Sequence, residues 1–459
     1  MELKDYETFE KELFEMLDNK QIKHFKETIE DMNEHDIATF ISNLPRKKIA
    51  VVFRLLPKSI SADVFANLEV EEQQLIIECI TDKELGEIIE ELYLDDAVDM
   101  LEELPANVVK RVMRTATSET RTLINQYLEY PEKSAGSIMT AEYVDLKKYM
   151  NVREAIARIR RIGKDRETIY TCFVISSDRK LEGVITVKDM LLSDDEAIIG
   201  DIMDTNVIYA TTTDDQEEVS ELISEYDLLA VPVVDKEGRL VGIVTVDDVI
   251  DVMQEELTED IEKMAGITPS DKPYSKTGVG DIWKSRIPWL MFLMLSATFT
   301  SMIINRFEDA LATCVVLTGF IPMLMDTGGN SGAQSSTAVI RSLSLGDTEP
   351  KDIFKVIWKE IRVAVLCGLT LSAVNFVKMF FVDRMLLGNS DVNVFVALTV
   401  SLTLIFVVVF AKVVGSTLPL AAEKLGIDPA VMASPLITTI TDAVSLLIYF
   451  SLAGVVLKI

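Results

Sequence analysis

The sequence predicts a multi-domain protein: an α-superhelical N-terminal domain, a tandem pair of α/β domains and an all-α transmembrane domain of five helices. Three observations support this fold class. The net charge of −29 lies entirely within residues 1–280, because the 13 basic and 13 acidic residues of 281–459 cancel. A motif near residue 136 returns near residue 200, and five long hydrophobic stretches follow. The chain therefore joins an acidic, water-exposed part to a neutral membrane part.

The acidic excess restricts the partners of the water-exposed part. A strongly negative surface argues against nucleic acid and anionic lipid and favours cations. The four cysteines are scattered without a CxxC pair and there are two histidines, so neither a disulfide framework nor a zinc site is indicated. Met1 to Lys20 is charged and lacks an apolar core, so we expect no cleaved signal peptide and a chain that begins in the cytoplasm.

Residues 1–132 show apolar residues at helical spacing, broken by Leu-Pro pairs. The pattern that runs from Asp36 to Pro45 returns 60 residues later, from Asp96 to Pro105. Repeats of this kind indicate stacked helix pairs. We therefore expect an acidic helical superhelix over this range.

Residues 133–199 and 200–256 form a duplication. The text Gly-x-Ile-Met begins at Gly136 and again at Gly200, and Leu181–Asp189 aligns with Leu240–Asp248. Each copy is predicted as helix, strand, turn, strand and helix. Both end in Gly-x-x-Thr-x-x-Asp, which resembles a tandem pair of CBS domains. That resemblance implies a regulatory module with a cleft that either is empty or holds an adenine nucleotide such as ATP, with four side chains at the ribose: Thr186, Asp189, Thr245 and Asp248.

Residues 257–284 are expected to connect the two halves. The segment begins with acidic residues and continues through Gly266, Pro269 and Gly278. A helix with glycine and proline breaks would act as a lever between the halves.

Residues 285–459 carry five hydrophobic stretches, each long enough to cross a hydrocarbon core about 30 Å thick. Basic residues flank the first stretch on its entry side, at Lys284 and Arg286, and Lys412 and Lys424 flank the turn between the fourth and fifth. The positive-inside rule then places the N-terminal half in the cytoplasm and the C-terminus outside. The expected stretches are 287–305, 311–343, 356–382, 393–422 and 430–457.

Two polar features interrupt this apolar text. Asp442 lies inside the last stretch, where an ionised carboxylate costs about 2.5 to 3.5 kcal/mol on insertion scales. The polar run 326–337 lies inside the second stretch, and it must line a water-filled path or a protein interface, because lipid cannot satisfy it. Oxygen ligands without Cys or His suit Mg²⁺, Ca²⁺ or Mn²⁺.

Three motifs and the order of the parts resemble the MgtE family of magnesium channels. The motifs are Asp-Thr-Gly-Gly-Asn-Ser-Gly-Ala-Gln-Ser at 326–335, Asp-Pro-Ala at 428–430 and the pair Thr441-Asp442. The resemblance implies a homodimer in the plasma membrane, with a pore on the two-fold axis between the second and fifth helices. Asp442 would be the ion-selecting carboxylate. The implied pore residues are Asp442, Thr438, Thr441, Asn330, Gln334 and Asp326.

The same resemblance implies that the acidic domains close a channel for Mg²⁺ influx when cytoplasmic Mg²⁺ binds to them. Crowded carboxylates repel one another until a divalent cation bridges them, so binding would compact the domains. The candidate metal ligands outside the pore are Asp95, Asp99, Asp215, Glu217, Glu218, Asp227, Asp248, Asp251, Glu256, Glu259, Asp260 and Asp428.

Three alternatives are considered. A channel for a wider set of divalent cations, including Mn²⁺ and Co²⁺, is the first. A membrane receptor that senses ATP through its CBS pair is the second, but it leaves the polar run at 326–337 unexplained. The third is an enzyme, because Asp326-Thr327-Gly328 has the text of an aspartic protease; the Tyr-Asp and Gly-x-Gly-Asp motifs of intramembrane proteases are absent from 281–459. We therefore expect no enzymatic activity.

Overall fold

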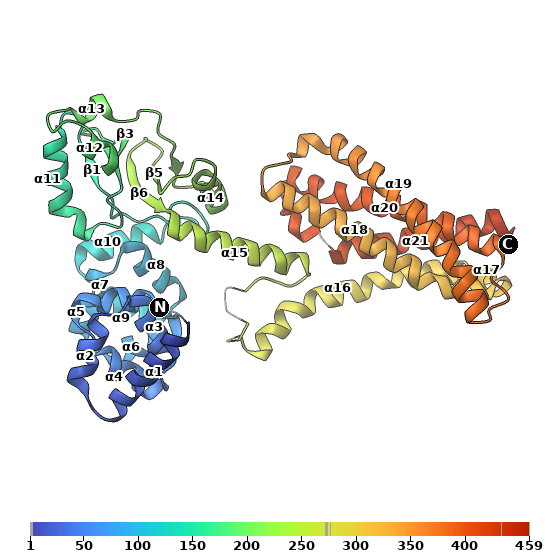
Figure 1. The fold of residues 1–459 in the computed structure, drawn as a ribbon, viewed down its shortest axis with the longest axis horizontal. Helices are drawn as coiled ribbons and strands as arrows, with labels where there is room; N and C mark the ends of the chain where they lie inside the picture. The colour runs from blue at the N-terminus through green and yellow to red at the C-terminus, as the bar shows by residue number, and fades with distance from the viewer. Residues whose placement is uncertain (1–2, 271–273, 276, 433, 459) are drawn as a thin grey trace. The chain divides into compact units, whose positions relative to one another are not determined.

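The computed structural model describes residues 3–458 except 271–273, 276 and 433 (Figure 1). It divides into two compact units, Met1–Met253 and Gln254–Ile459. The first unit contains a helical array and two small β-sheets, and the second is helical throughout its described part.

The first unit begins with an array of short helices packed in series, as the repeated Leu-Pro text predicts (Figure 1). Pro45, Pro57 and Pro105 each occupy the position just before a helix, where a missing N–H costs nothing. The buried faces form one continuous core. The helices are α1 Leu3–Asp18, α2 Ile22–Glu30, α3 Glu34–Ser42, α4 Arg46–Phe53, α5 Lys58–Ala66, α6 Val70–Cys79, α7 Asp82–Glu91, α8 Leu94–Glu103, α9 Ala106–Thr115 and α10 Ser118–Tyr127.

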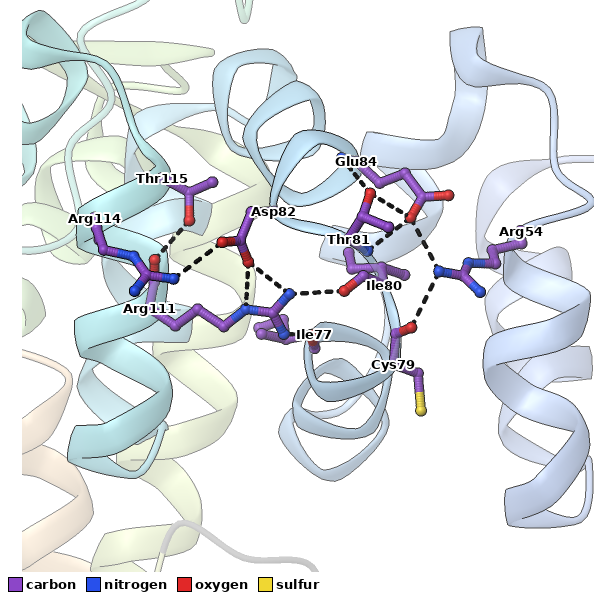
Figure 2. A network of polar contacts seen from close by, with 10 residues as sticks. All are labelled: Arg54, Ile77, Cys79, Ile80, Thr81, Asp82, Glu84, Arg111, Arg114 and Thr115. Carbon is purple, nitrogen blue, oxygen red and sulfur yellow. Dashed lines mark hydrogen bonds and ion pairs between the residues drawn. The ribbon is translucent and has the colours of Figure 1, made fainter.

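Arginines tie successive turns of this array together (Figure 2). Arg111 of α9 donates to the carbonyl of Ile80, at 2.7 Å, and to Asp82 Oδ1, at 2.9 Å. From the other side, Arg54 donates to the carbonyl of Cys79 and to Glu84, both at 3.1 Å. The link between α6 and α7 is therefore held by neighbours on both sides, which fixes the pitch of the array.

Two three-stranded sheets follow, with the same topology in each sequence copy. In both, a short first strand pairs in parallel with the second, and the second pairs antiparallel with the third. The elements are β1 Asp145–Leu146, α11 Val152–Ile162, β2 Thr171–Ile175, β3 Leu181–Thr186, α12 Val187–Leu192, α13 Ile199–Ile202, β4 Ala210–Thr211, α14 Gln216–Glu225, β5 Ala230–Val234, β6 Leu240–Thr245 and α15 Val246–Met264.

The repeated Gly-x-Ile-Met text has a structural reason, because each copy inserts its methionine into the other copy's sheet. A Cβ atom at Gly183 would lie 2.6 Å from Sδ of Met203, and one at Gly242 would lie 2.6 Å from Sδ of Met139. Only glycine leaves room for these contacts. The two copies are thereby interlocked into one module.

One expectation about the connector differs from the structure. The sequence predicts a boundary between the second copy and the connecting helix after residue 256. Helix α15 instead begins at Val246, directly after β6, and continues without interruption to Met264. The connector thus begins as a continuous extension of the last helix of the second copy.

The second unit contains the hydrophobic stretches as helices. Among the residues that the structure describes, four segments are long and apolar enough to cross a membrane: Val279–Arg306, Pro350–Leu386, Val394–Lys424 and Pro429–Leu457. The remaining stretch forms a helix of 24 residues, Ile321–Ser344, whose polar run lowers its hydropathy. The helices are α16 Val279–Arg306, α17 Glu308–Thr313, α18 Ile321–Ser344, α19 Ile353–Lys378, α20 Val394–Lys424 and α21 Ser434–Leu457.

Small residues let α18 lie directly against α20 and α21 (Figure 1). A Cβ atom at Gly415 of α20 would overlap the carbonyl oxygen of Gly332. A Cβ atom at Gly332 would lie 2.6 Å from Cγ2 of Ile437 on α21. Backbone-to-backbone contact of this kind is a common way for membrane helices to pack.

We expect Gly415→Ala to destabilise the second unit, because the atom in the way belongs to a backbone that cannot turn aside. The cost should be about 1 to 3 kcal/mol, and it should appear as a lower aggregation temperature of the detergent-purified protein. Gly280→Ala on α16 is the matched control, because a Cβ atom there meets nothing within 4 Å. Equal aggregation temperatures for the two variants would contradict the close crossing.

Candidate ion path and carboxylate clusters

One face of α18 carries a stripe of oxygen-bearing side chains. Asp326, Asn330 and Gln334 follow at intervals of four residues, so they share one helix face. All three are exposed within the single chain, whereas Gly328 and Gly332 on the opposite face are buried. The polar run therefore has a packed side and an open side.

Helix α21 brings Asp442 to this stripe. Thr438 and Asp442 are four residues apart on α21 and are both partly exposed. The Thr438 side chain packs against Gly329 of α18, where a Cβ atom would lie 2.9 Å from Cγ2 of Thr438. Asp326 is the acidic group whose charge acts on Asp442. The structure thus gathers two carboxylates from two membrane helices.

Thr441 lies apart from the other predicted pore residues. It is 0% exposed, and its hydroxyl donates to the carbonyls of Ile437, at 2.8 Å, and Thr438, at 3.0 Å. Its methyl group would lie 3.6 Å from a Cβ atom at Gly332. Thr441 therefore packs α21 against α18 behind the open face.

The sequence prediction that Lys412 flanks the turn between the fourth and fifth stretches was wrong. Lys412 lies well inside α20 and is 5% exposed. Its ammonium group donates to Oγ of Ser335 on α18 at 3.1 Å, and Ser335 donates to Glu360 on α19 at 2.6 Å. Counting basic residues near helix ends cannot reveal this contact, because the partner charge lies in another helix.

In the first unit, four carboxylates form a second group, here called the sensor cluster. Asp95 and Asp96 lie on α8, Asp248 lies on α15, and Glu167 lies in the loop before β2. Asp95 and Asp248 were predicted as ligands, and Asp96 and Glu167 were missed. Oδ1 of Asp95 is buried and has no hydrogen-bond partner among the described residues. An unsatisfied buried carboxylate oxygen is costly unless a proton or a cation occupies the site.

The pKa values of the sensor cluster are all raised. Burial and then repulsion by Asp248 raise the pKa of Asp96 to about 6. The same two causes raise the pKa of Glu167 to about 7. Burial is also the main cause that raises the pKa of Asp95 well above its usual range and that of Asp248 to a lesser degree. The cluster therefore holds protons more strongly than isolated carboxylates do.

The other candidates on the first unit lie outside this cluster. Asp99 and Asp251 are exposed on α8 and α15, and the charge of Asp251 contributes to the raised pKa of Asp248. Asp215 caps α14 by accepting from the amide of Glu217 at 2.9 Å. The remaining members, Glu217 and Glu218 in the first turn of α14 and Asp227 just after it, are exposed.

A third group, the connector cluster, lies in the second unit and consists of Glu256, Glu259, Asp260 and Asp428 around Lys263. Lys263 donates to Oδ2 of Asp428 at 2.5 Å and also pairs with Glu259. Asp260 accepts a longer bond, 3.4 Å, from Ser344, and burial followed by repulsion from Asp428 raises its pKa. An internal ammonium group thus lies beside two of the predicted metal ligands, Glu259 and Asp428. Across the described chain, no three His, Cys, Asp or Glu side chains converge as metal ligands would.

The two Thr-x-x-Asp endings have different surroundings. In the first copy, Thr186 and Asp189 cap α12 reciprocally, with 2.5 Å between Oγ1 and Oδ2, and Asp189 is exposed. In the second copy, Thr245 is buried and donates to Asp248, which belongs to the sensor cluster. The first pair is therefore open to a ligand, while the second is shared with the carboxylates.

These features define a class: a helical membrane protein that carries an acidic helical array and a CBS pair. Comparison with known families agrees, since residues 321–452 match the MgtE divalent cation transporter family, 32–133 the MgtE intracellular N domain, and 135–195 and 199–255 the CBS domain. The chain is 37% identical over 450 residues to the magnesium transporter MgtE of Thermus thermophilus, covering 97% of this chain and 98% of that protein. This chain belongs to the MgtE family, which is a family of transporters and not of enzymes.

Other similarities agree with this assignment. The Bacillus subtilis magnesium transporter MgtE is 33% identical over 442 residues, with 95% of each chain covered. A crystal structure of the soluble part of a magnesium transporter is 33% identical, with a TM-score of 0.53, and covers 55% of this chain and 99% of its own. The cytosolic domain of the Mg²⁺ channel MgtE in complex with ATP is 38% identical, with a TM-score of 0.50, and covers 52% and 98%.

We expect the first unit to lose stability as pH rises in the presence of a chelator. The pKa values of Asp96 and Glu167 are raised on folding, so their contribution is complete below pH about 4 and is lost as pH rises through about 6 to 7. The first melting transition of the full chain, followed by circular dichroism, should fall by roughly 3 to 8 °C between pH 5 and pH 8.

The matched control is the double variant Asp96→Asn, Glu167→Gln, whose melting temperature should vary less with pH. The two histidines of the chain, His24 and His35, are exposed and have no part in the cluster. A wild-type melting temperature that is constant over this range, or that rises with pH, would contradict the assignment.

Proposed function

We propose that this chain is a Mg²⁺ channel that carries Mg²⁺ into the cell and is closed by Mg²⁺ bound to its acidic domains. The observation that carries the proposal is the meeting of Asp442 on α21 with the oxygen stripe of α18. The names of the relatives in Thermus thermophilus and Bacillus subtilis support Mg²⁺ as the transported ion. Mg²⁺ keeps several waters, so a site with few carboxylates and neutral oxygens suits it.

A homodimer completes the proposed path. The stripe formed by Asp326, Asn330 and Gln334 is open in one chain, and a polar face open to lipid would be too costly. A two-fold axis beside this face would bring a second stripe and a second Asp442 opposite the first. Two carboxylates facing one another then select a divalent cation over a monovalent one. The carbonyls near Thr438 would contact the waters of the hydrated ion.

The proposed orientation places the N-terminus and both acidic clusters in the cytoplasm and the C-terminus outside. Lys284 and Arg286 lie in the first turns of α16, and the segment between α18 and α19 contains Lys351, with Lys355 just inside α19. The positive-inside rule puts these residues on the cytoplasmic side. Five membrane crossings then leave the C-terminus on the opposite side of a plasma membrane.

The proposed gate uses the repulsion within the two clusters. When cytoplasmic Mg²⁺ is low, the carboxylates of the sensor cluster repel one another and favour a loose arrangement. When it is high, the ion bridges them and stabilises the compact one. Because α15 carries Asp248 at its start and Glu259 and Asp260 near its end, one continuous helix takes part in both clusters.

ATP is a second proposed ligand of the first unit. The solved cytosolic domain that binds ATP is similar to this chain over 52% of its length. Of the two Thr-x-x-Asp endings, Thr186 and Asp189 supply the open pair, so we place the nucleotide there. Thr245 is buried and bonded to Asp248, which favours a role beside the sensor cluster.

Replacing Asp442 by Ala should reduce Mg²⁺ flux into liposomes to the background level, because the path loses the carboxylates that replace part of the ion's hydration. The matched control is Asp391→Ala, the same change at an exposed acid between α19 and α20. Wild-type flux with Asp442→Ala would contradict the pore assignment.

The same liposome assay distinguishes a Mg²⁺ channel from a channel for a wider set of divalent cations. A Mg²⁺ channel should carry Mn²⁺ and Co²⁺ much more slowly than Mg²⁺ at equal concentration. Equal rates would support the broader divalent cation channel.

Replacing Lys263 by Met should make the channel more sensitive to inhibitory Mg²⁺. The ammonium group of Lys263 competes with Mg²⁺ for Glu259 and Asp428. Replacing Lys263 removes this competing positive charge, so Mg²⁺ should bind the two carboxylates more tightly. The cytoplasmic Mg²⁺ concentration for half-inhibition of flux should fall on the order of fivefold. Lys263→Arg keeps the charge and should resemble the wild type. A concentration that is unchanged or higher in Lys263→Met would contradict the competition.

A further inference from the structure

The membrane half contains a charged group that the proposed ion path does not use. Lys412 of α20 and Glu360 of α19 are 4.0 Å apart, with side chains that are 7% and 15% exposed. Ser335 of α18 lies between them and makes both a bond from Lys412 and a bond to Glu360. Ionisable residues within membrane helices are rare and are usually retained for a functional reason.

We propose that Lys412, Ser335 and Glu360 form a clamp that fixes the rotation of α18 and thereby aims its oxygen stripe at the ion path. These three are positioning residues. The ion itself passes Asn330, Gln334 and Asp442. The proposal rests on the proposed function for its consequence in ion flux, but the rotation of α18 can be measured separately.

The hydroxyl of Ser335 bridges the two charged side chains of the clamp. Its hydroxyl accepts from the ammonium group and donates to the carboxylate, so both of its hydrogen-bonding roles are used. The hydroxyl must therefore face α19 and α20. In this rotation of α18 one hydroxyl satisfies both charged partners at once.

The clamp lies next to the residues it would aim. Successive residues of a helix are turned by about 100°, so holding Ser335 inward directs its neighbour Gln334 outward, together with Asn330 one turn before it. The contact between Gly332 and Gly415 lies one turn from Ser335 and sets the distance between α18 and α20. The glycine contacts restrain α18 through van der Waals packing alone. The clamp adds a polar restraint on its rotation.

The charges also account for the specificity of the contact. A buried ion pair is weak evidence for stability, and its best-attested use is to fix one arrangement among several. A rotation of α18 that turned Ser335 away and placed Gln334 at Lys412 would leave the pair without its bridging hydroxyl. The rotation of α18 about its axis is thus the quantity that the clamp controls.

The test uses the full chain with its four cysteines replaced and Asn330→Cys added, so that a membrane-impermeant thiol reagent reports the exposure of the stripe. The variants are Lys412→Met, Glu360→Gln, the double variant and Ser335→Ala. Lys359→Met is the matched control, because Lys359 is the exposed neighbour of Glu360 on α19. The second readout is Mg²⁺ flux in liposomes with Asn330 restored, separated into maximal rate and half-saturating concentration.

Each single variant should change the labelling rate of the cysteine introduced at position 330 by about threefold or more and raise the half-saturating Mg²⁺ concentration by a similar factor. The double variant should show the same change as a single variant and no more, because either substitution alone already breaks the clamp. Lys359→Met should match the wild type in both readouts. If a single variant does not fold, the double variant and Ser335→Ala decide the matter by the same readouts.

A purely structural role predicts a different result: less folded protein, with wild-type labelling and half-saturation in the folded fraction. That result would overturn the clamp, as would a double variant whose effects equal the sum of the two single ones. If the wild type carries no Mg²⁺ at all, the proposed function fails, and the labelling of the introduced cysteine still decides the clamp.

Discussion

Negative charge without a matching positive charge is the constraint on which the rest of this structure depends. Asp442 and Asp326 act on one another in the membrane half, and the sensor cluster gathers Asp95, Asp96, Glu167 and Asp248 in the other. Each group is costly as it stands, since repulsion and desolvation add. A divalent cation relieves both costs. The proposed transported ion and the proposed regulatory ion would therefore meet one physical requirement.

Two other groups of charged residues contain both signs of charge, unlike the carboxylate groups. Lys412 and Glu360 satisfy one another through Ser335, and Lys263 satisfies Glu259 and Asp428. The first pair is closed to ions and restrains a helix. The second lies partly exposed on the connector, where Mg²⁺ can compete with the ammonium group. Burial and pairing thus separate a structural use of charge from a regulatory one.

Much of the fold could be predicted because its signals are local. The duplicated Gly-x-Ile-Met text located both sheets, and the Leu-Pro pairs located the short helices of the array. The contact partners could not be predicted, because they join distant parts of the chain. Glu167 has no pattern around it, so its place beside Asp96 and Asp248 required the structure. The surroundings of Lys412 and Thr441 could not be predicted either, because hydropathy gives the helix and not the direction of a side chain.

We propose that Mg²⁺ controls its own entry through the acidic clusters. The most direct test of this proposal is Mg²⁺ flux through oriented channels in liposomes, measured at a fixed gradient of a tracer while Mg²⁺ is varied on the side of the acidic domains alone. The account predicts that flux falls as that Mg²⁺ rises, and that combining Asp96→Asn with Glu167→Gln weakens the effect. Flux that does not depend on Mg²⁺ on that side would contradict the account.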